Sequence, residues 1–502
     1  MENETNERND EDNLLESMQR DVDLSPVGRT THEDSKERML FGARGFTKEG
    51  MVFLLKEMVV RHCNRELSIE RVIHAIPDCF DATEVDLLLG MALASTPFLQ
   101  GLLVPIGDRI SMELAKFISL ALEQSTSIQS LVLTRLLTFE IAQGQIIREL
   151  LHGFSLNRNQ RSKQIRLYSL GRQEEFLEDN AGRNGIVQAI GQAPGLTDIE
   201  CSACSADAVV TFLEGACLNE SIKRVTLICD SVRDEGWDGN QRVPFVLRNL
   251  IETSSSLREL KLIESRISDR VAQSFFIALA QPISSLKNME VKIEKLSASS
   301  INCLQSTLRS NRSLRNVTVQ CATTEGSLAD ALSLIFEEKT CHLESLSLLD
   351  VPIGPDSLDR FLLSIRDVDS FISLTLEENG RDNDHALESI HRVCAHLPHL
   401  VSLKKLCYAP SVRFPRALWD DFLEAVAANT TLTEINVGDF DPSYLEIGVG
   451  AIAKRNRFRL MVVDKKTSRC LWPLAIRSLQ KDESAMFECL KLIMDKIVTS
   501  EG

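Results

Sequence analysis

Few residues of this chain have types and spacings that could do chemistry, and Cys201 and Cys204 are the first to consider. A Cys-x-x-Cys spacing can hold a redox-active dithiol or supply two ligands to a metal ion. A structural zinc site takes four such ligands, and no second Cys-x-x-Cys is present to supply the other two. We interpret the pair as two thiols placed by a structural repeat, with a redox or metal role as the alternative.

Two further segments suggest chemistry but lack its full signature. The glycine-rich segment 448–454 has no Gly-Lys-Ser/Thr ending, so it is typical of the small-residue face of a helix and not of a phosphate loop. His391, Cys394 and His396 lie in a helical pattern that does not bring all three to one face. There is no His-Glu-x-x-His and no Gly-x-Ser-x-Gly motif. We therefore expect no metal, no cofactor and no catalytic activity.

Composition and charge narrow the classes of partner. The 502 residues are 43% hydrophobic and 25% charged, with a formal net charge of −16. This charge argues against binding to nucleic acid or to an anionic membrane surface, both of which require basic side chains. No run of eighteen apolar residues is present, so no membrane span is expected.

The acidic charge is partly concentrated at the beginning of the chain. Residues 1–38 contain twelve acidic and five basic side chains and few large apolar ones, which predicts a disordered acidic tail. The first twelve residues lack the apolar core of a secretory signal, so we expect a cytoplasmic protein, with the nucleus as the alternative. In either compartment the thirteen cysteines stay reduced. The four Asn-x-Ser/Thr sequences beyond the tail, at Asn219, Asn311, Asn316 and Asn429, are then unmodified.

An internal repeat organises most of the chain. The pattern L-x-x-L-x-L, with other large apolar residues allowed, begins at Leu257 and returns at spacings of 29, 28, 29 and 28 residues. Looser copies lie on both sides, which makes about twelve units between residues 98 and 457. The apolar triplets are Leu99/Leu102/Val104, Ile128/Leu131/Leu133, Leu196/Ile199/Cys201, Ile222/Val225/Leu227, Leu257/Leu260/Leu262, Leu286/Met289/Val291, Leu314/Val317/Val319, Leu343/Leu346/Leu348, Phe371/Leu374/Leu376, Leu403/Leu406/Tyr408 and Leu432/Ile435/Val437, with Ile165/Leu167 as a partial copy that lacks its first apolar residue.

A helical pattern follows each short strand. Ser268 is a predicted N-cap, and Pro355 suits the first turn of a helix that presents Leu358, Phe361 and Ile365 on one face. Units of 28–29 residues with real helices resemble the ribonuclease-inhibitor-type leucine-rich repeats. The resemblance implies an α/β solenoid, a curved horseshoe with parallel strands on its concave face and helices on its convex face. Most units lack the Asn or Cys that this family places at the ninth position, so less regular turns are expected.

The ends of the solenoid require caps, because an uncovered terminal repeat exposes its apolar face. We predict a helical N-terminal cap over residues 39–97, repeats over 98–457 and a C-terminal helical cap over 458–502. The ending that begins at Leu471 and Trp472 resembles the tails of uncharacterised algal leucine-rich-repeat proteins. The chain is expected to act as a monomer.

Strand periodicity predicts where a partner would bind. Apolar positions point into the stack and the residues between them point outward, and a dozen strands about 4.8 Å apart would form a surface of roughly 55 Å, the size of a protein footprint. We predict a protein partner on this face, with Arg166, Tyr168 and Arg224 as anchors because Arg and Tyr are common binding hot spots. A merely solvated face is the alternative. The full predicted set is Gln164, Arg166, Tyr168, Asp198, Glu200, Arg224, Glu259, Lys261, Glu290 and Lys292.

One insertion could add to this surface. The unit that starts at Ile222 runs 35 residues to Leu257, and its extra length surrounds Trp237. Inserts in repeat proteins emerge as loops that can carry recognition, and the alternative is that Trp237 packs on its own solenoid. We therefore predict a non-catalytic protein-interaction scaffold. The alternatives are a regulator of a partner enzyme, such as a GTPase-activating leucine-rich-repeat protein, and a ubiquitin-ligase adaptor, for which residues 39–97 show no clear F-box-like module.

Overall fold

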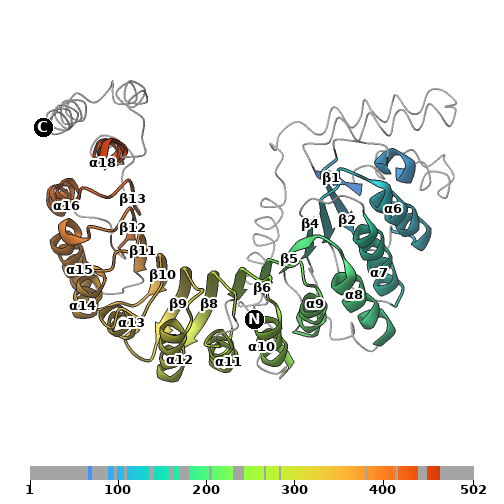
Figure 1. Ribbon diagram of the computed structural model, residues 1–502, viewed down its shortest axis with the longest axis horizontal. Coiled ribbons are helices and arrows are strands. Elements are labelled where there is room, and N and C mark those ends of the chain that lie inside the picture. The colour runs from blue at the N-terminus through green and yellow to red at the C-terminus, as the bar shows by residue number, and fades with distance from the viewer. Residues whose placement is uncertain are drawn as a thin grey trace, which may run out of the picture.

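Within the residues that the structure describes, thirteen strands form one parallel sheet whose spatial order follows the chain. In this computed structural model the sheet bends into an open arc, with strands on the inner side and helices on the outer side (Figure 1). This is the curved leucine-rich-repeat-type solenoid that the repeat spacing predicts. The described residues are 66–69, 89–94 and 99–463, except for 107–109, 135–140, 158–162, 169–179, 203–205, 230–241, 265–266, 282–283, 379–382, 411, 413–415 and 439–448.

Strands and helices alternate along the arc. The strands are β1 (Glu66–Ser68), β2 (Gly101–Pro105), β3 (Ser130–Thr134), β4 (Lys163–Tyr168), β5 (Leu196–Ser202), β6 (Arg224–Cys229), β7 (Glu259–Glu264), β8 (Asn288–Leu296), β9 (Asn316–Thr324), β10 (Ser345–Val351), β11 (Ser373–Glu378), β12 (Lys405–Ala409) and β13 (Glu434–Val437). The helices are α6 (Met112–Gln124), α7 (Ile141–Leu156), α8 (Asn180–Gln192), α9 (Ala206–Leu218), α10 (Arg242–Thr253), α11 (Asp269–Leu279), α12 (Ala298–Ser310), α13 (Leu328–Glu337), α14 (Pro355–Ile365), α15 (Asn383–His396), α16 (Arg416–Ala428) and α18 (Gly450–Val463), with a 3-10 turn η3 (Leu397–His399) after α15.

The predicted apolar triplets form the core of the stack. Every member is buried except Ile435, which is half-buried. The strand register pairs equivalent positions of successive units, as in Leu260 with Met289 and Leu346 with Leu374. Each buried leucine therefore packs on the leucines of the units before and after it.

The sheet begins one strand earlier than the first predicted unit. β1 pairs in parallel with β2 through Leu67 and Leu102, and both side chains are buried. A strand thus lies inside the stretch 39–97 for which we predicted a helical cap, although residues 89–94 are helical. Three residues of strand are too short to give an alternating pattern that stands out from the surrounding sequence.

The partial repeat at Ile165 is completed by a lysine. The register shifts between Lys163 and Gln164, so Lys163 pairs with Leu196, the first apolar residue of the next unit. Lys163 is completely buried, and its ammonium donates to the carbonyl oxygens of Phe154, Ser155 and Asn157 at 3.4, 3.4 and 2.7 Å. These carbonyls lie at and just after the C-terminal end of α7, where a positive charge is favourable.

Buried asparagines connect successive units, four of them directly after the C-terminal ends of α7, α9, α12 and α16 and one within α18. The amide of Asn311 donates to Leu279 O (2.7 Å) in the preceding unit, while its oxygen accepts from Leu314 N (2.9 Å) and from Ser313. The same arrangement recurs in the described chain at Asn219 and Asn429, and Asn157 and Asn456 make the equivalent donations across units. Three of these asparagines belong to the Asn-x-Ser/Thr sequences. Their side-chain amides make hydrogen bonds within the fold.

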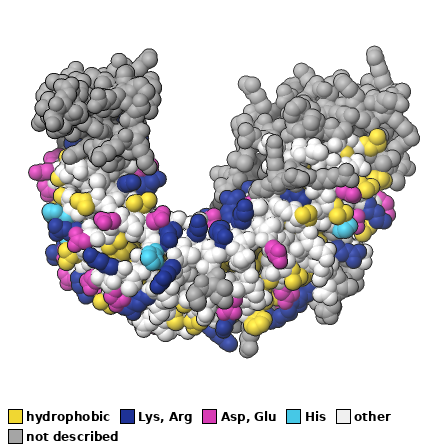
Figure 2. Space-filling view, in the orientation of Figure 1, with side chains coloured by type: hydrophobic (Ala, Val, Ile, Leu, Met, Phe, Trp, Pro, Cys, Tyr) yellow, Lys and Arg dark blue, Asp and Glu magenta, His cyan; other side chains and the backbone are white. Residues whose placement is uncertain are grey.

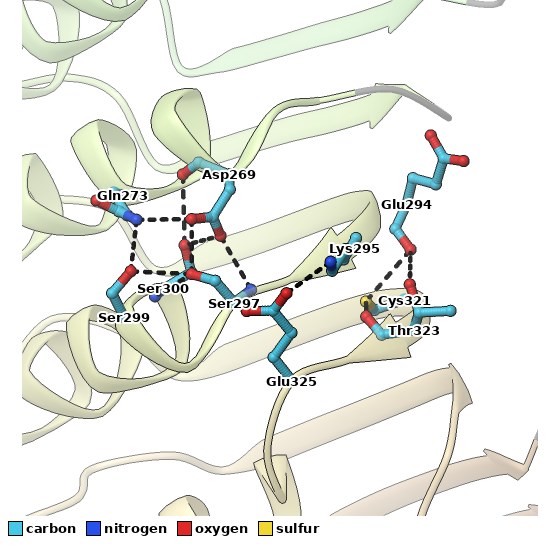
Figure 3. A network of polar contacts seen from close by, with 10 residues as sticks. All are labelled: Asp269, Gln273, Glu294, Lys295, Ser297, Ser299, Ser300, Cys321, Thr323 and Glu325. Atoms are coloured by element: carbon cyan, nitrogen blue, oxygen red, sulfur yellow. Dashed lines mark hydrogen bonds and ion pairs between the residues drawn. The ribbon is translucent and has the colours of Figure 1, made fainter.

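Helix caps behave as their sequences predict. Ser268 caps α11 by accepting from Val271 N at 3.3 Å, and Pro355 occupies the first turn of α14. A network links the caps of neighbouring helices (Figure 3). The Asp269 carboxylate accepts from Ser297 N (3.0 Å), Ser297 Oγ (2.6 Å), Ser300 Oγ and Gln273 Nε2 (2.7 Å). One carboxylate thereby joins the beginning of α11 to the beginning of α12.

Several predicted features fall outside the described residues. They are the acidic tail over 1–38, most of the N-terminal cap, the C-terminal cap beyond residue 463, Trp237 with its loop, and Cys204. These expectations stay predictions.

Candidate partner-binding surface

The outward residues of successive strands form continuous ladders on the concave face. One ladder joins Arg166, Glu200, Thr226, Lys261 and Glu290 through direct strand pairing. The neighbouring ladder joins Gln164, Asp198, Arg224, Glu259 and Asn288. The two ladders place most of the predicted partner-binding residues side by side on five strands, β4 to β8, in the middle of the arc.

Tyr168 and Arg166 both contact Glu200 on the next strand. The Tyr168 hydroxyl donates to Glu200 Oε1 at 2.7 Å, and Arg166 Nε lies 3.8 Å from Glu200 Oε2. On its own strand, Arg166 lies beside Gln164, whose amide oxygen accepts from Arg166 Nε at 2.8 Å when turned toward it. Two of the three predicted anchors are therefore held in place by neighbours within the fold.

Arg224 is held in a similar way. It makes a close ion pair with Asp198 on β5, which raises the pKa of the Arg224 side chain. The Asp198 side chain is only 9% exposed, whereas the Arg224 side chain is 58% exposed. The acid is thus buried beneath a cation that remains open to a partner.

Lys261 completes an alternation of charge across the ladders. Its ammonium lies 2.9 Å from Glu290 and 3.6 Å from Glu259, and the hydrogen bond to Glu290 raises the pKa of Lys261. Arg166, Arg224 and Lys261 therefore each lie beside a carboxylate on an adjacent strand. Such a surface has little net charge but a strong local pattern, which favours a partner with the complementary order of charges.

The strands also enclose a shallow hollow of about 300 Å³. Its walls are predominantly polar, and five of the eight lining residues carry charge. They are Gln164, Arg166, Asp198, Ile199, Glu200, Arg224, Thr226 and Glu259. Sites for small molecules are usually mostly apolar, so this hollow is better suited to one or two polar side chains from a protein.

Beyond β8 the concave face changes character. The ladder that carries Arg166 continues as Thr318, Ser347, Thr375 and Cys407. These side chains are small and uncharged. Along this ladder the face is therefore mostly charged from β4 to β8 and uncharged from β9 to β12.

The remaining chemistry-bearing residues are distributed as the repeat dictates. Cys201 points into the core and is 1% exposed. His391, Cys394 and His396 lie on α15, where His396 Nε2 is 3.0 Å from Asp359 on α14. In the described part of the chain, no three His, Cys, Asp or Glu residues are grouped to hold a metal ion. No described helix is both long and apolar enough to cross a membrane.

The pairing between side chains was not predictable from the sequence. Arg224 and Asp198 lie 26 residues apart, and their contact depends on the register of β5 against β6. The sequence signal that was available is the alternation of charge sign at equivalent outward positions of consecutive units. Val132 was also missed, since it occupies an outward position beside Arg166 yet is 3% exposed.

Comparison with known proteins adds little to this geometry. No protein-family model matches the chain, and no curated protein sequence does. Among solved structures, the chain is similar to one in the "Crystal structure of Rad7 and Elc1 complex in yeast", with a TM-score of 0.39 and 14% sequence identity. That similarity covers 88% of this chain and 94% of the other. At this level it carries no inference about partners.

Proposed function

We propose that the chain is a non-catalytic scaffold that binds a protein partner on its concave face, across β4 to β8. The observation that carries the proposal is the cluster formed by Arg166, Tyr168 and Arg224 with their acidic neighbours. Arg and Tyr dominate protein-binding hot spots because they combine contact area with hydrogen bonding. Here they lie on β4 and β6, close together on a face that is wide enough for a protein.

The internal ion pairs favour binding. A long side chain costs roughly 0.5–1.5 kcal/mol to immobilise at an interface. Because Arg166 and Arg224 already contact Glu200 and Asp198, part of this ordering has occurred before the partner arrives. Ordinary surface ion pairs contribute only about 0–1 kcal/mol to stability, so these pairs add more to the geometry of the face than to the stability of the fold.

The test is affinity capture from cell lysate with the full chain and with Arg166→Ala/Tyr168→Ala/Arg224→Ala. We expect a partner that the natural chain retains and the triple variant loses, with at least a tenfold loss of affinity. The matched control is Arg248→Ala/Arg360→Ala on the convex helices, where each arginine also pairs with a carboxylate, at 2.8 and 3.0 Å. Equal retention by the triple variant and the control would contradict the placement.

A second proposal is that the chain regulates a partner enzyme, for instance a GTPase. It is favoured by Arg224, a cation that is exposed but fixed in direction by Asp198, since regulators of this class stabilise transition-state charge with polar side chains. GTP turnover by any captured GTPase, measured with the natural chain and with Arg224→Ala, separates it from the scaffold. Stimulation that Arg224→Ala removes supports the regulator, and retention without stimulation supports the scaffold. If the chain is a ubiquitin-ligase adaptor, a subunit of a ubiquitin ligase should be among the captured proteins.

The finer family assignment belongs to the proposal as well. The spacing of 28–29 residues between successive strands, each followed by an α-helix, supports a ribonuclease-inhibitor-like repeat. The net charge of −16 supports a protein and not a nucleic acid or membrane as the principal partner. We propose that the chain is a cytoplasmic monomer, which fluorescence microscopy and light scattering of the full chain test.

A further inference from the structure

A row of basic side chains follows the edge of the solenoid where the chain enters the strands. Lys223, Arg258, Lys287 and Arg315 each immediately precede a strand, from β6 to β9. The backbone joins them in order: Arg258 N donates to Lys223 O, Lys287 N to Arg258 O and Arg315 N to Lys287 O, each at 2.8 Å. We name these four residues the basic stripe. Figure 2 shows Lys and Arg side chains gathered along the inner rim at the middle of the arc.

The stripe is short and has defined ends. The same backbone ladder continues to Thr197 on one side and to Glu344 on the other. Adjacent parallel strands lie about 4.8 Å apart, so the four cations extend over roughly 14 Å. An extended polypeptide covers that distance with about four or five residues at roughly 3.3 Å each.

Two of the four cations have a visible structural role. Nη1 of Arg258 donates to three backbone carbonyls, those of Ser255, Leu257 and Ser285, at 2.9, 3.2 and 3.3 Å. Two units further along the arc, Nη1 of Arg315 donates to the equivalent carbonyls, those of Arg312, Leu314 and His342, at 2.9, 3.0 and 3.4 Å. These bonds fix both guanidinium groups at the rim.

The two lysines have no such role. Lys223 and Lys287 are both exposed, and neither ammonium has a protein partner within the described part of the chain. Two free ammonium groups alternate with two fixed guanidinium groups, on a chain whose net charge is −16. Their backbones lie about 4.8 Å apart. In the described part of the chain, Arg315 is the one stripe residue that pairs with a carboxylate, Glu344 at 3.3 Å, so the repulsion among the other three cations favours the binding of an anion.

We propose that the basic stripe binds a short acidic peptide segment of the protein that occupies the concave face. The proposal rests on the proposed function, because the segment belongs to that partner. Arg224 and Glu259 directly follow Lys223 and Arg258, so a partner seated on the charged ladders lies next to the stripe. The partner is thus expected to present acidic residues where it leaves the arc at this edge.

The surroundings favour a short peptide over a longer polyanion. Double-stranded DNA carries one charge per roughly 1.7 Å of its axis and would extend from the stripe onto Glu344. It would also face the carboxylates of Asp198, Glu259 and Glu290 on the adjoining face. A short acidic segment can pair with Lys223, Arg258 and Lys287, which no described carboxylate contacts, whereas Arg315 already lies 3.3 Å from Glu344.

The test uses the full chain and a fluorescent hexaglutamate peptide, with hexaglutamine as the uncharged control. The variant is Lys223→Glu/Lys287→Glu, which leaves the arginine–carbonyl contacts in place. The matched control is Lys116→Glu/Lys404→Glu, with the same change in net charge. Lys116 is exposed on α6, and Lys404 precedes β12 at the same edge but beyond Glu344.

We expect hexaglutamate to bind more tightly than hexaglutamine, with the stripe variant about three- to thirtyfold weaker and the control unchanged. Equal loss in both variants, or no preference for hexaglutamate, would overturn the proposal. Tighter, stripe-dependent binding of a single-stranded oligonucleotide would overturn it too. So would tighter, stripe-dependent binding of a peptide with the sequence of residues 1–38, which would assign the stripe to the chain itself.

The captured partner separates this inference from the proposed function. If its affinity falls with the Arg166/Tyr168/Arg224 triple variant but not with Lys223→Glu/Lys287→Glu, the stripe proposal fails and the concave-face proposal stands. If neither variant changes its affinity, both fail. Thermal unfolding of each variant, monitored by circular dichroism, establishes that the fold is retained.

Discussion

Asn311→Ala is the substitution that tests most directly how successive repeats are held together. Asn311 is 3% exposed, and its side chain serves two units at once. Its removal leaves Leu279 O and Leu314 N buried without partners, each of which loses a bond of 2.7 or 2.9 Å. A buried polar group without a partner costs about 1–3 kcal/mol, so the free energy of unfolding should fall by roughly 2–5 kcal/mol.

The assay is urea unfolding followed by circular dichroism, with Asn302→Ala as the control. Asn302 is exposed on α12, nine residues away in the same unit, and its replacement should change stability by less than about 0.5 kcal/mol. Asn311→Asp adds a second comparison, because it keeps the accepting oxygen but turns another oxygen toward Leu279 O. At neutral pH it should be at least as damaging as Ala. A cost below about 1 kcal/mol for Asn311→Ala, or one equal to that of Asn302→Ala, would refute the bridging role.

Three further substitutions test individual polar groups, each by urea unfolding. Burial, opposed in part by the hydrogen bond from Tyr408, raises the pKa of Glu378 to about 7 from 4.5. The folded state therefore prefers the protonated acid. The stabilisation that this preference gives the folded state is complete below pH 4.5 and is lost as the pH rises through 7. The unfolding free energy of the natural chain should fall by up to about 3 kcal/mol over that interval relative to Glu378→Gln, and parallel pH profiles would contradict this. Burial lowers the pKa of Lys163, so its charge costs stability below that pKa, and stability should rise as the pH increases toward 10.5. Lys163→Met should stay within about 1 kcal/mol of the natural chain at pH 7, whereas Lys163→Ala leaves a cavity and should cost roughly 3 kcal/mol; a cost as large for Lys163→Met as for Lys163→Ala would show that the three carbonyl contacts outweigh desolvation. Partial burial would raise the pKa of Asp269, but the hydrogen bonds drawn in Figure 3 outweigh this effect and lower it. Asp269→Ala should cost about 2 kcal/mol at pH 7, and the difference should shrink as the pH falls below 3.8, since protonation removes the same bonds; a pH-independent difference would point to packing instead.

The core of the fold was predictable because its signal is repeated. A strand of period two that returns every 28–29 residues marks the same inward positions many times, so single irregular members cause no error. Tyr408 illustrates this point, since an aromatic residue in a leucine position is still completely buried. The same period placed the charged residues of β4 to β8 on the opposite, concave face.

Features that depend on the exact length of a repeat unit, or on contacts between units, were not predictable from the sequence. Lys163 takes a leucine position because the unit is shifted by one residue, and the sequence alone shows only that an apolar residue is missing. Three of the buried asparagines were visible only as Asn-x-Ser/Thr sequences, because the partners of their side-chain amides are backbone carbonyls of the preceding unit. Contacts such as Arg224 with Asp198 depend on the register of β5 against β6, because only that register places the two residues opposite each other.

The measurement that tests the central claim most directly is hydroxyl-radical footprinting of the full chain with its captured partner. Tyr168 reports on the concave face, and Phe245, 70% exposed on α10, reports on the convex face. We expect the partner to protect Tyr168 from oxidation and to leave Phe245 unchanged. Protection of Phe245 with unchanged oxidation of Tyr168 would show that the partner binds the helices and would contradict binding in the arc.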